Sequence, residues 1–575
     1  MVIKLADTAG FCMGVRRAVD IVLERARRKG TERIFTYGPL IHNPQTVEVL
    51  QKRGIVPLDV IDDIDGGVVI IRAHGITPDE RRRLKAKGAT LVDATCPKVA
   101  RVQSIIMKHT AQGYGIVIIG DADHPEVKSL LGYARGTGMV VSAKDNVSLI
   151  PQEGKLCVVA QTTQSSQQFE EIVDAILKVH PDALIFNSIC DSTERRQAEV
   201  RELAESMDAM VIVGGRDSAN TRRLASISRE IGIPTFHVET ADELESHNMS
   251  RFEKIGVSAG ASTPNWIIDG VVDYLTHCRG EGDGKRARIL FRAWIALVRT
   301  DLYSAIGAGC LSLVGMLLQG MAVNSIYIVI AATYVYAVHT INRLHDRNIG
   351  RISGSFREES YLKNRSLYWS AAVVCLILSL VLAALRGPIP LVFLLVLSVF
   401  GILYDIAIFP HSWRVKRLGD IPGSKNLFMA LAWAVVAAVV PWAAERGENA
   451  AAAVVAFVFV FALVFVKSAL SDMIDIQSDR IVGRDTIPLA IGEEKTRRLL
   501  YAISVAVAFI LLAAPFLGYV PKASLVLETT IFYMWICIVL CDRKGRLSTV
   551  VHEGLLGTNY IIAGILGFAW LVAKA

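Results

Sequence analysis

The first 280 residues alternate short apolar runs with amphipathic segments. Each apolar run ends in a polar or Gly-rich loop that leads into a helical pattern. These units recur at 33–44, 68–80, 115–127, 156–166, 209–221 and 255–264. Continuous apolar strands that alternate with helices are typical of parallel sheets covered on both faces. We therefore expect an α/β domain over residues 1–280, with ligands bound beyond the carboxyl ends of its strands.

The pattern changes abruptly near residue 285. From about residue 291, apolar stretches have lengths near the roughly 17–25 residues that a membrane-spanning helix needs. The nine stretches lie at 296–318, 323–341, 367–385, 389–409, 426–442, 451–470, 499–517, 524–541 and 558–573. We predict an all-α, nine-helix transmembrane domain over residues 291–575. A Gly-rich and then basic linker at 281–290 joins it to the first domain.

Loop charge gives the orientation of the predicted spans. The loops after the second, fourth, sixth and eighth spans carry several Lys or Arg each, whereas the opposite loops carry at most one. The positive-inside rule places the first set of loops in the cytoplasm, on the same side as the α/β domain. We therefore expect a multi-pass protein of the cell inner membrane with a cytoplasmic N-terminal domain.

Several classes of protein are disfavoured. Neither GxGxxG nor GxxxxGK[ST] occurs in the first half, so dinucleotide and P-loop sites have no support, and we expect no nucleic-acid partner. The nine cysteines are unevenly spaced and lie in a predicted cytosolic domain and in membrane spans, which disfavours a disulfide framework. Residues 1–9 contain no apolar core of the length that a signal peptide needs.

Three cysteines share one kind of setting. Cys12, Cys96 and Cys190 each follow a short apolar lead-in, which for Cys96 is the strand pattern 89–92, and each precedes a helix with basic residues. Helix amides and nearby Arg favour the thiolate, the form that binds soft metals. No CxxC offers the fourth ligand of a zinc site. We predict an iron–sulfur cluster with one iron open to substrate; the alternative is three separate structural cysteines.

Neutral polar side chains recur after the predicted strands. Hydroxyl, amide and imidazole donors at helix starts form a suitable cradle for a phosphate or diphosphate. The candidates are His42, His74, His124, Thr162, Ser218, Asn220 and Ser262. Taken singly, each is equally explained as a helix cap or a loop histidine.

Glu126 follows His124 by two residues, with Pro125 between them. Burial would raise the pKa of this carboxyl group toward the working range of a proton donor. The alternative is a solvated Glu at a helix N-terminus, which the helix dipole favours.

In their order along the chain, these motifs resemble the 4-hydroxy-3-methylbut-2-enyl diphosphate reductases, the LytB/IspH family. The resemblance covers residues 1–280. It rests on Cys12 in GFCMGV, His42 in IHNP, His74 in RAHG, Cys96 in DATCP, 124–126 HPE, 161–163 QTT, Cys190 in SICDSTERRQ, 218–220 SAN and 260–263 GAST. One departure is Ala219, where the family usually has a second Ser.

The resemblance implies three α/β lobes around a 4Fe–4S cluster held by Cys12, Cys96 and Cys190. Glu126, next to His124, would deliver the proton as the substrate hydroxyl leaves as water, with Thr162 helping to position it. The diphosphate would be held by His42, His74, His124, Ser218, Asn220 and Ser262. An external ferredoxin or flavodoxin is the expected electron donor. A cluster-bearing sensor or binding module is the alternative function.

Carboxylates cluster in the loop after the sixth predicted span. Asp472, Asp475 and Asp479 have the spacing that puts three acids on one helix face. Such a group repels itself unless it binds cations, and Mg²⁺ that bridges to a diphosphate is the usual use. Asn342 and Asp346 after the second span would form the facing half-site. The alternative is a solvated loop face.

The second half resembles the UbiA family of membrane prenyltransferases. The resemblance rests on the nine spans, DMIDIQSD, GRDTIPLAIG, NRLHD and 416–433. It implies Mg²⁺-dependent transfer of a prenyl group from its diphosphate to a lipophilic acceptor. Arg343 and Gly350 depart from the family's first Asp-rich motif. Either one metal is lost and Arg343 meets phosphate directly, or the domain is an inactive anchor.

Overall fold

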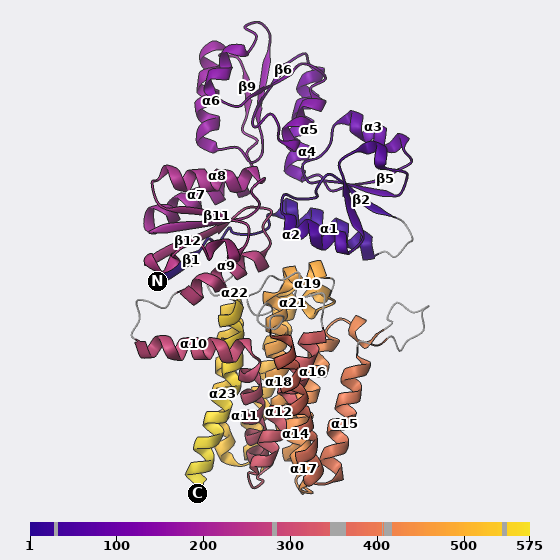
Figure 1. The fold of residues 1–575 in the computed structure, drawn as a ribbon, viewed down its shortest axis with the longest axis vertical. Coiled ribbons are helices and arrows are strands. Elements are labelled where there is room, and N and C mark those ends of the chain that lie inside the picture. Colours follow the sequence, from indigo (N-terminus) through magenta and orange to yellow (C-terminus); the bar gives the residue numbers. More distant parts are fainter. Residues whose placement is uncertain are drawn as a thin grey trace. The chain divides into compact units, whose positions relative to one another are not determined.

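The structure is a computed structural model that describes residues 1–27, 33–278, 285–345, 364–404, 406, 417–482, 484–542 and 549–574. The chain forms two compact units, Met1–Glu281 and Gly282–Ala575 (Figure 1). The first unit is α/β and the second is helical. Both classes agree with the alternating and the continuous apolar patterns of the two halves.

Three four-stranded parallel sheets form the N-terminal unit (Figure 1). The first has the order β3-β2-β4-β5, with strands Ile55–Leu58, Ile34–Tyr37, Val68–Ile71 and Thr90–Asp93. The second has the order β7-β6-β8-β9, with strands Gly138–Val141, Gly115–Ile119, Leu156–Ala160 and Leu184–Phe186. The third has the order β1-β12-β10-β11, with strands Val2–Leu5, Lys254–Ala259, Ala209–Val213 and Thr235–Val238. The first and last strands of the unit are therefore neighbours.

Each of the six apolar runs in the sequence forms one inner strand of a sheet. The inner strands are β2 and β4 in the first sheet, β6 and β8 in the second, and β10 and β12 in the third. Every residue of β4, β8 and β10 is buried, whereas the edge strand β1 is partly exposed. Inner strands of a parallel sheet are covered on both faces, and this explains their continuous apolar sequences.

Helices follow the strands and start at functional candidates. They are α1 (Met13–Arg27), α2 (Pro44–Lys52), α3 (Pro78–Ala86), α4 (Pro97–Ala111), α5 (Pro125–Tyr133), α6 (Ser166–Val179), α7 (Asp191–Ser206), α8 (Ala219–Glu230) and α9 (Asn265–Cys278). Proline, whose fixed φ suits the first turn, opens α2, α3, α4 and α5. The N-cap residues of α4, α5, α7 and α8 are Cys96, His124, Cys190 and Ser218. Each N-cap follows a strand and so lies at the edge where parallel sheets bind ligands.

The second unit is built from helices. They are α10 (Lys285–Arg299), α11 (Leu302–Leu318), α12 (Ser325–His345), α14 (Arg365–Leu385), α15 (Pro388–Leu403), α16 (Ser424–Ala434), α17 (Val440–Ala444), α18 (Ala450–Ile474), α19 (Ile476–Val482), α20 (Ile487–Ile491), α21 (Glu493–Phe516), α22 (Glu528–Asp542) and α23 (Thr549–Lys574). A π-helical segment, Val435–Val439, joins α16 to α17.

The described residues contain fewer full spans than the nine predicted. Seven helices are long and apolar enough to cross a membrane, and the α10–α11 pair makes an eighth if it counts as one bent span. The predicted span 296–318 is interrupted because Asp301, with φ of 59°, separates the two helices. The predicted span 389–409 corresponds to α15, which ends at Leu403 and is shorter than the others. Arg299, Thr300 and Asp301 lie within this predicted span, but the apolar residues on both sides of them hid the break.

The core of this unit surrounds α18. This helix packs against α11, α16, α21, α22 and α23. At its middle, Phe459 and Val460 are fully buried. On α11, Gly315 lies so close to the π-helical segment that an added Cβ would be 2.6 Å from the carbonyl oxygen of Ala437. Small residues thus let the helices approach closely, as membrane helix packing requires.

Candidate functional site

The three cysteines lie at the starts of three helices. Cys96 and Cys190 are the N-caps of α4 and α7, and Cys12 immediately precedes α1. All three are free thiols of intermediate burial. Each thiol therefore lies beside unpaired helix N–H groups, and the backbone N–H of Val15 is 3.5 Å from the sulfur of Cys12.

The three thiols converge. A Cβ added to Gly14 would lie 2.6 Å from the Sγ of Cys96 and 3.9 Å from the Sγ of Cys12. Burial raises the pKa of the Cys96 thiol, the N–H groups of Lys98 and Val99 oppose this shift, and the nearby thiols of Cys12 and Cys190 add to it. The sequence separates these sulfurs by most of the unit, but the fold brings them into one electrostatic neighbourhood.

The backbone of each cysteine is tied to a strand-end loop. The Cys12 N–H donates to the Ala261 carbonyl (3.1 Å), the Cys96 N–H to the Ala73 carbonyl (2.9 Å), and the Cys190 N–H to the Thr162 carbonyl (2.9 Å). Ala261 and Ala73 immediately precede Ser262 and His74 in the chain. The residues that fix the thiols are thus the candidate polar residues or their direct neighbours.

Three histidines from different strand ends meet beside these loops. The ring centroids of His42, His74 and His124 are 4.8 to 5.8 Å apart. Their ligand nitrogens lie within 4.8 Å of one another. Burial is the main cause that lowers the pKa of all three rings, to about 4 for His124. The rings are therefore neutral near pH 7, and each offers one donor and one acceptor.

Several buried polar atoms in this region have no hydrogen-bond partner among the residues that the structure describes. They are Nε2 of His42, Nδ1 of His74, and both Oδ1 and Nδ2 of Asn220. Ser218 caps α8 by accepting from the Thr221 N–H (3.4 Å), and the Ser262 hydroxyl donates to the His42 carbonyl (3.2 Å). Because unpaired buried polar atoms are costly, their convergence indicates a ligand with many acceptor oxygens.

Glu126 and Thr162 form a buried pair. The carboxylate accepts from the Thr162 N–H (2.7 Å) and from the Thr162 hydroxyl (2.9 Å). Glu126 is 1% exposed, and this burial raises its pKa although the bonds from Thr162 oppose the shift. The N–H of Glu126 in turn approaches Nδ1 of His124 (3.2 Å). A carboxyl group so placed is suited to hold and release a proton.

Two arginines of the site were not anticipated from the sequence: Arg196, which is buried, and Arg223, which is partly buried. Arg223 donates to Asp121 (2.8 Å) and to the Thr163 carbonyl (2.9 Å), beside the Glu126–Thr162 pair. Arg196, on α7, lies near Cys12 and Cys190. Arginines on helices are most often exposed to solvent. The sequences 194–197 ERRQ and 220–223 NTRR, which contain these two residues, therefore gave no indication that the side chains would be covered.

The aspartates of the membrane unit cluster where α18 ends. Asp472 accepts from the Asn426 amide (2.8 Å), Asp475 caps α18, and Asp479 lies 3.4 Å from Arg484. Burial, and then the charge of Asp472, raise the pKa of Asp479 to about 7. Carboxylates that lie this close together repel one another, and a bound cation would relieve this repulsion.

The facing half-site is described only in part. Asp346 and Gly350 lie outside the described residues. Asn342 is exposed on α12, and among the described residues no hydrogen bond joins it to the three aspartates. Arg343 makes a two-point contact with the buried carboxylate of Asp301, through Nε (3.0 Å) and an Nη (2.8 Å). Asp301, which lies at the break between α10 and α11, is therefore the ion-pair partner of Arg343.

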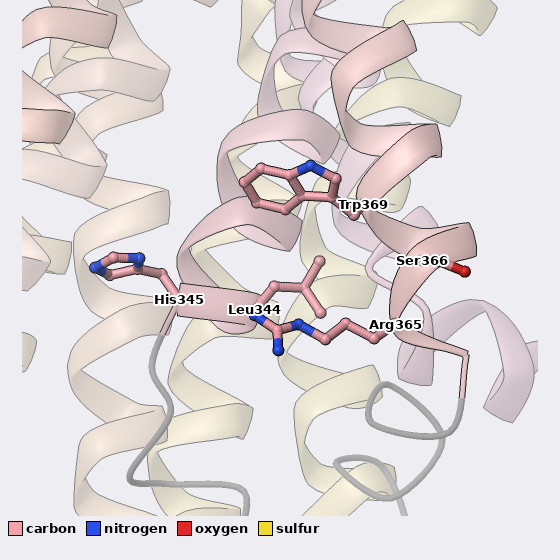
Figure 2. A pocket seen from close by; sticks show the side chains of 5 residues that line it. All are labelled: Leu344, His345, Arg365, Ser366 and Trp369. Carbon is pink, nitrogen blue, oxygen red and sulfur yellow. The ribbon is translucent and has the colours of Figure 1, made fainter.

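A cavity of about 530 Å³ lies beside these residues, where α12 ends and α14 begins. It is lined by Leu344, His345, Arg365, Ser366 and Trp369. Figure 2 shows Arg365 and Trp369 pointing toward Leu344, whereas Ser366 points away. A cationic group beside an aromatic ring is typical of helix ends at a membrane interface.

Comparison with known proteins finds a matching family model for part of each unit. The LytB protein family matches residues 3–276, and the UbiA prenyltransferase family matches residues 308–552. A curated 4-hydroxy-3-methylbut-2-enyl diphosphate reductase from Geobacter sp. is 43% identical over 277 residues, which are 48% of this chain and 97% of that protein.

Solved structures resemble each unit. The E-1-hydroxy-2-methyl-but-2-enyl-4-diphosphate reductase from Plasmodium falciparum is 29% identical, with a TM-score of 0.46, over 48% of this chain and 88% of that chain. A UbiA homolog from Aeropyrum pernix is 16% identical, with a TM-score of 0.38, over 47% of this chain and 98% of that chain.

The lowered pKa of His124 predicts that the folded protein loses stability in acid. Folded His124 binds a proton only below about pH 4, whereas an unfolded histidine does so below about 6.5. The unfolded state therefore binds more protons between these values, and the stability that this difference supplies is lost as the pH falls from 6.5 toward 4. We expect His124→Asn, which keeps an N-cap side chain, to flatten the fall of Tm with acid. The exposed His247→Asn serves as control, and an unchanged slope in His124→Asn would contradict the prediction.

Proposed function

The chain belongs to the LytB family, and we propose that its N-terminal unit reduces 4-hydroxy-3-methylbut-2-enyl diphosphate to isopentenyl and dimethylallyl diphosphates. This is the last step of the non-mevalonate isoprenoid pathway. Two electrons and two protons replace the hydroxyl group by hydrogen and release water. The proposal rests on three thiols, three histidines and a buried carboxyl that converge in a unit 43% identical to a reductase of this name.

Cys12, Cys96 and Cys190 would hold a 4Fe–4S cluster. The donors fit this group, because three convergent thiols without a fourth leave one iron open. Gly14 keeps the space between the sulfurs of Cys12 and Cys96 clear. When bound, the cluster supplies electrons singly and an open iron that attracts the substrate's hydroxyl group.

The neutral cradle would bind the diphosphate. Nε2 of His42, Nδ1 of His74 and Nδ2 of Asn220 are buried without hydrogen-bond partners among the described residues, and these nitrogens would donate to the phosphate oxygens. His124, Ser218 and Ser262 complete the cradle at helix starts and loops. Because the histidines are neutral before binding, a highly charged ligand would also draw protons onto them.

Glu126 would deliver the proton that the departing hydroxyl group needs. Burial raises its pKa, so the carboxyl group holds a proton nearer to neutral pH than a solvated Glu does. Thr162 fixes both carboxylate oxygens, and His124 fixes the backbone at Glu126. The Cys190 N–H donates to the Thr162 carbonyl. Thr162 therefore contacts both the proposed proton donor and the loop that carries Cys190.

We expect Glu126→Gln to lower kcat by at least about 100-fold, because the amide keeps the shape but has no proton to give. The cluster's EPR spectrum should remain that of the wild type. Activity is measured on the anaerobically purified full chain with a chemical reductant. The exposed Glu171→Gln is the control, and near-normal turnover in Glu126→Gln would rule out this proton donor.

Gly14→Ala tests the thiol site separately from catalysis. The added methyl group would lie 2.6 Å from the Cys96 sulfur, so we expect severalfold less iron and sulfide per chain. The neighbouring Met13→Ala, on a side chain that is 65% exposed, should retain the wild-type content. Equal iron in both variants would contradict the assignment of this space to a cluster.

The second unit is proposed to transfer a prenyl group from its diphosphate to a lipophilic acceptor. Asp472, Asp475 and Asp479 would hold Mg²⁺, with Asn342 and Asp346 as candidates for the facing half. Two of these carboxylates, Asp472 and Asp479, are buried, and the charges of Asp472 and Asp475 help to raise the pKa of Asp479, which supports this site. The pairing of Arg343 with Asp301 leaves the first half-site with a cation where the family usually has an acid.

The proposed setting is the cell inner membrane. The protein is multi-pass, and nine crossings result if α10–α11 and the short α15 both count. The excess of basic residues in alternate loops supports a cytoplasmic N-terminal unit. There a soluble ferredoxin or flavodoxin would supply electrons, and membrane lipid would surround the prenyl acceptor.

We expect Asp472→Asn to weaken Mn²⁺ binding, with Mn²⁺ standing in for Mg²⁺, by about tenfold or more in the presence of a prenyl diphosphate. An asparagine at this position can still accept the hydrogen bond from the Asn426 amide, but it has no negative charge. Binding is measured by EPR of free Mn²⁺ with the detergent-solubilised chain. Glu494→Gln, an exposed change on α21, is the control, and unchanged affinity in Asp472→Asn would exclude this carboxylate as a ligand.

A further inference from the structure

Arg196 is a buried cation with an unusual set of partners. Its side chain is 2% exposed on α7, six residues after Cys190. Two guanidinium nitrogens donate to backbone carbonyls, those of Ala259 (2.7 Å) and Gly10 (3.0 Å). The third, Nε, is buried without a hydrogen-bond partner. Among the described residues, no carboxylate forms an ion pair with Arg196.

Two of the three candidate ligand thiols lie within electrostatic reach of this charge. The charge of Arg196 interacts with Cys12, Glu199 and Cys190, and the strength of the interaction decreases in that order. Glu199 has its own partners, since its carboxylate accepts from the N–H and hydroxyl groups of Thr8 and from the Asp7 N–H. Glu199 therefore offsets the cation only in part, and the thiols of Cys12 and Cys190 would add to this compensation when they carry charge.

A buried charge without a close counter-ion is costly unless the site supplies one. Here the compensating anion would arrive with the cluster and its three thiolates. Each electron added to that group increases its negative charge, and a fixed cation in a low dielectric favours the added charge. An arginine remains charged at any working pH, so this influence is permanent.

We propose that Arg196 is a positioning residue with an electrostatic role: it fixes the loop before Cys12 and makes the cluster easier to reduce. This inference rests on the proposed function of the thiol site. A purely mechanical clamp between Gly10 and Ala259 is the competing explanation, since the two hydrogen bonds would serve that purpose without any effect of charge.

The chain contains a matched control. Arg17 also donates to a carbonyl beside a ligand cysteine, that of Thr95 before Cys96 (3.0 Å). Arg17 is exposed, however, so water screens its charge. A clamp role predicts similar effects of changing either arginine, whereas a charge effect predicts a difference between them.

The test is a redox titration, followed by EPR, of the anaerobically purified full-length protein. We expect Arg196→Gln to shift the midpoint potential of the cluster to a more negative value, Arg196→Lys to restore most of the shift, and Arg17→Gln to leave the potential unchanged. Iron content is measured in each sample. An unshifted potential in Arg196→Gln with its cluster intact would overturn the electrostatic role.

A second variant keeps the test decisive if Arg196→Gln does not retain a cluster. Glu199→Gln removes the carboxylate that partly offsets Arg196, and it keeps a side chain of the same size on the surface of α7. We expect this variant to shift the midpoint potential to a more positive value, and no shift would overturn the proposal. Absence of a cluster from the wild-type chain would instead contradict the proposed function itself.

Discussion

Three cysteine loops, separated by most of the N-terminal unit, must deliver their sulfur atoms to one place. The fold meets this constraint with backbone hydrogen bonds, one from each cysteine N–H to a loop at the end of a strand. Two of the acceptors directly precede His74 and Ser262, and the third belongs to Thr162. A shift in any of these loops would therefore move a thiol and a polar residue together. The positions of the three thiols and of the candidate polar residues are therefore mechanically coupled.

The charges of the site follow from its burial. The histidines are neutral because desolvation lowers their pKa values, and Glu126 is biased toward its protonated form because desolvation raises its pKa. Arg196, which is buried, and Arg223, which is partly buried, remain as cations, one near the thiols and the other paired with Asp121. Neutral donors that are already in position are suited to replace the water around a multiply charged ligand.

Much of the architecture could be predicted from the sequence because burial leaves a pattern. The inner strands are covered on both faces, and so their sequences are continuously apolar. Edge strands such as β1 and β11 are partly exposed and give no such signal. The helix break at Asp301 was missed because apolar residues continue on both sides of it. The pairing of Arg343 with Asp301 depends on that break, and so it could not be foreseen.

The candidate site was predictable in its loops but not in its supporting arginines, whose burial depends on tertiary packing. The most direct test of the account is Mössbauer spectroscopy of ⁵⁷Fe-loaded, anaerobically purified full-length protein with and without 4-hydroxy-3-methylbut-2-enyl diphosphate. The account predicts four irons per chain, one of which is distinct and changes its parameters when the substrate is added. Iron held in another form, or four irons that do not respond to the substrate, would contradict it.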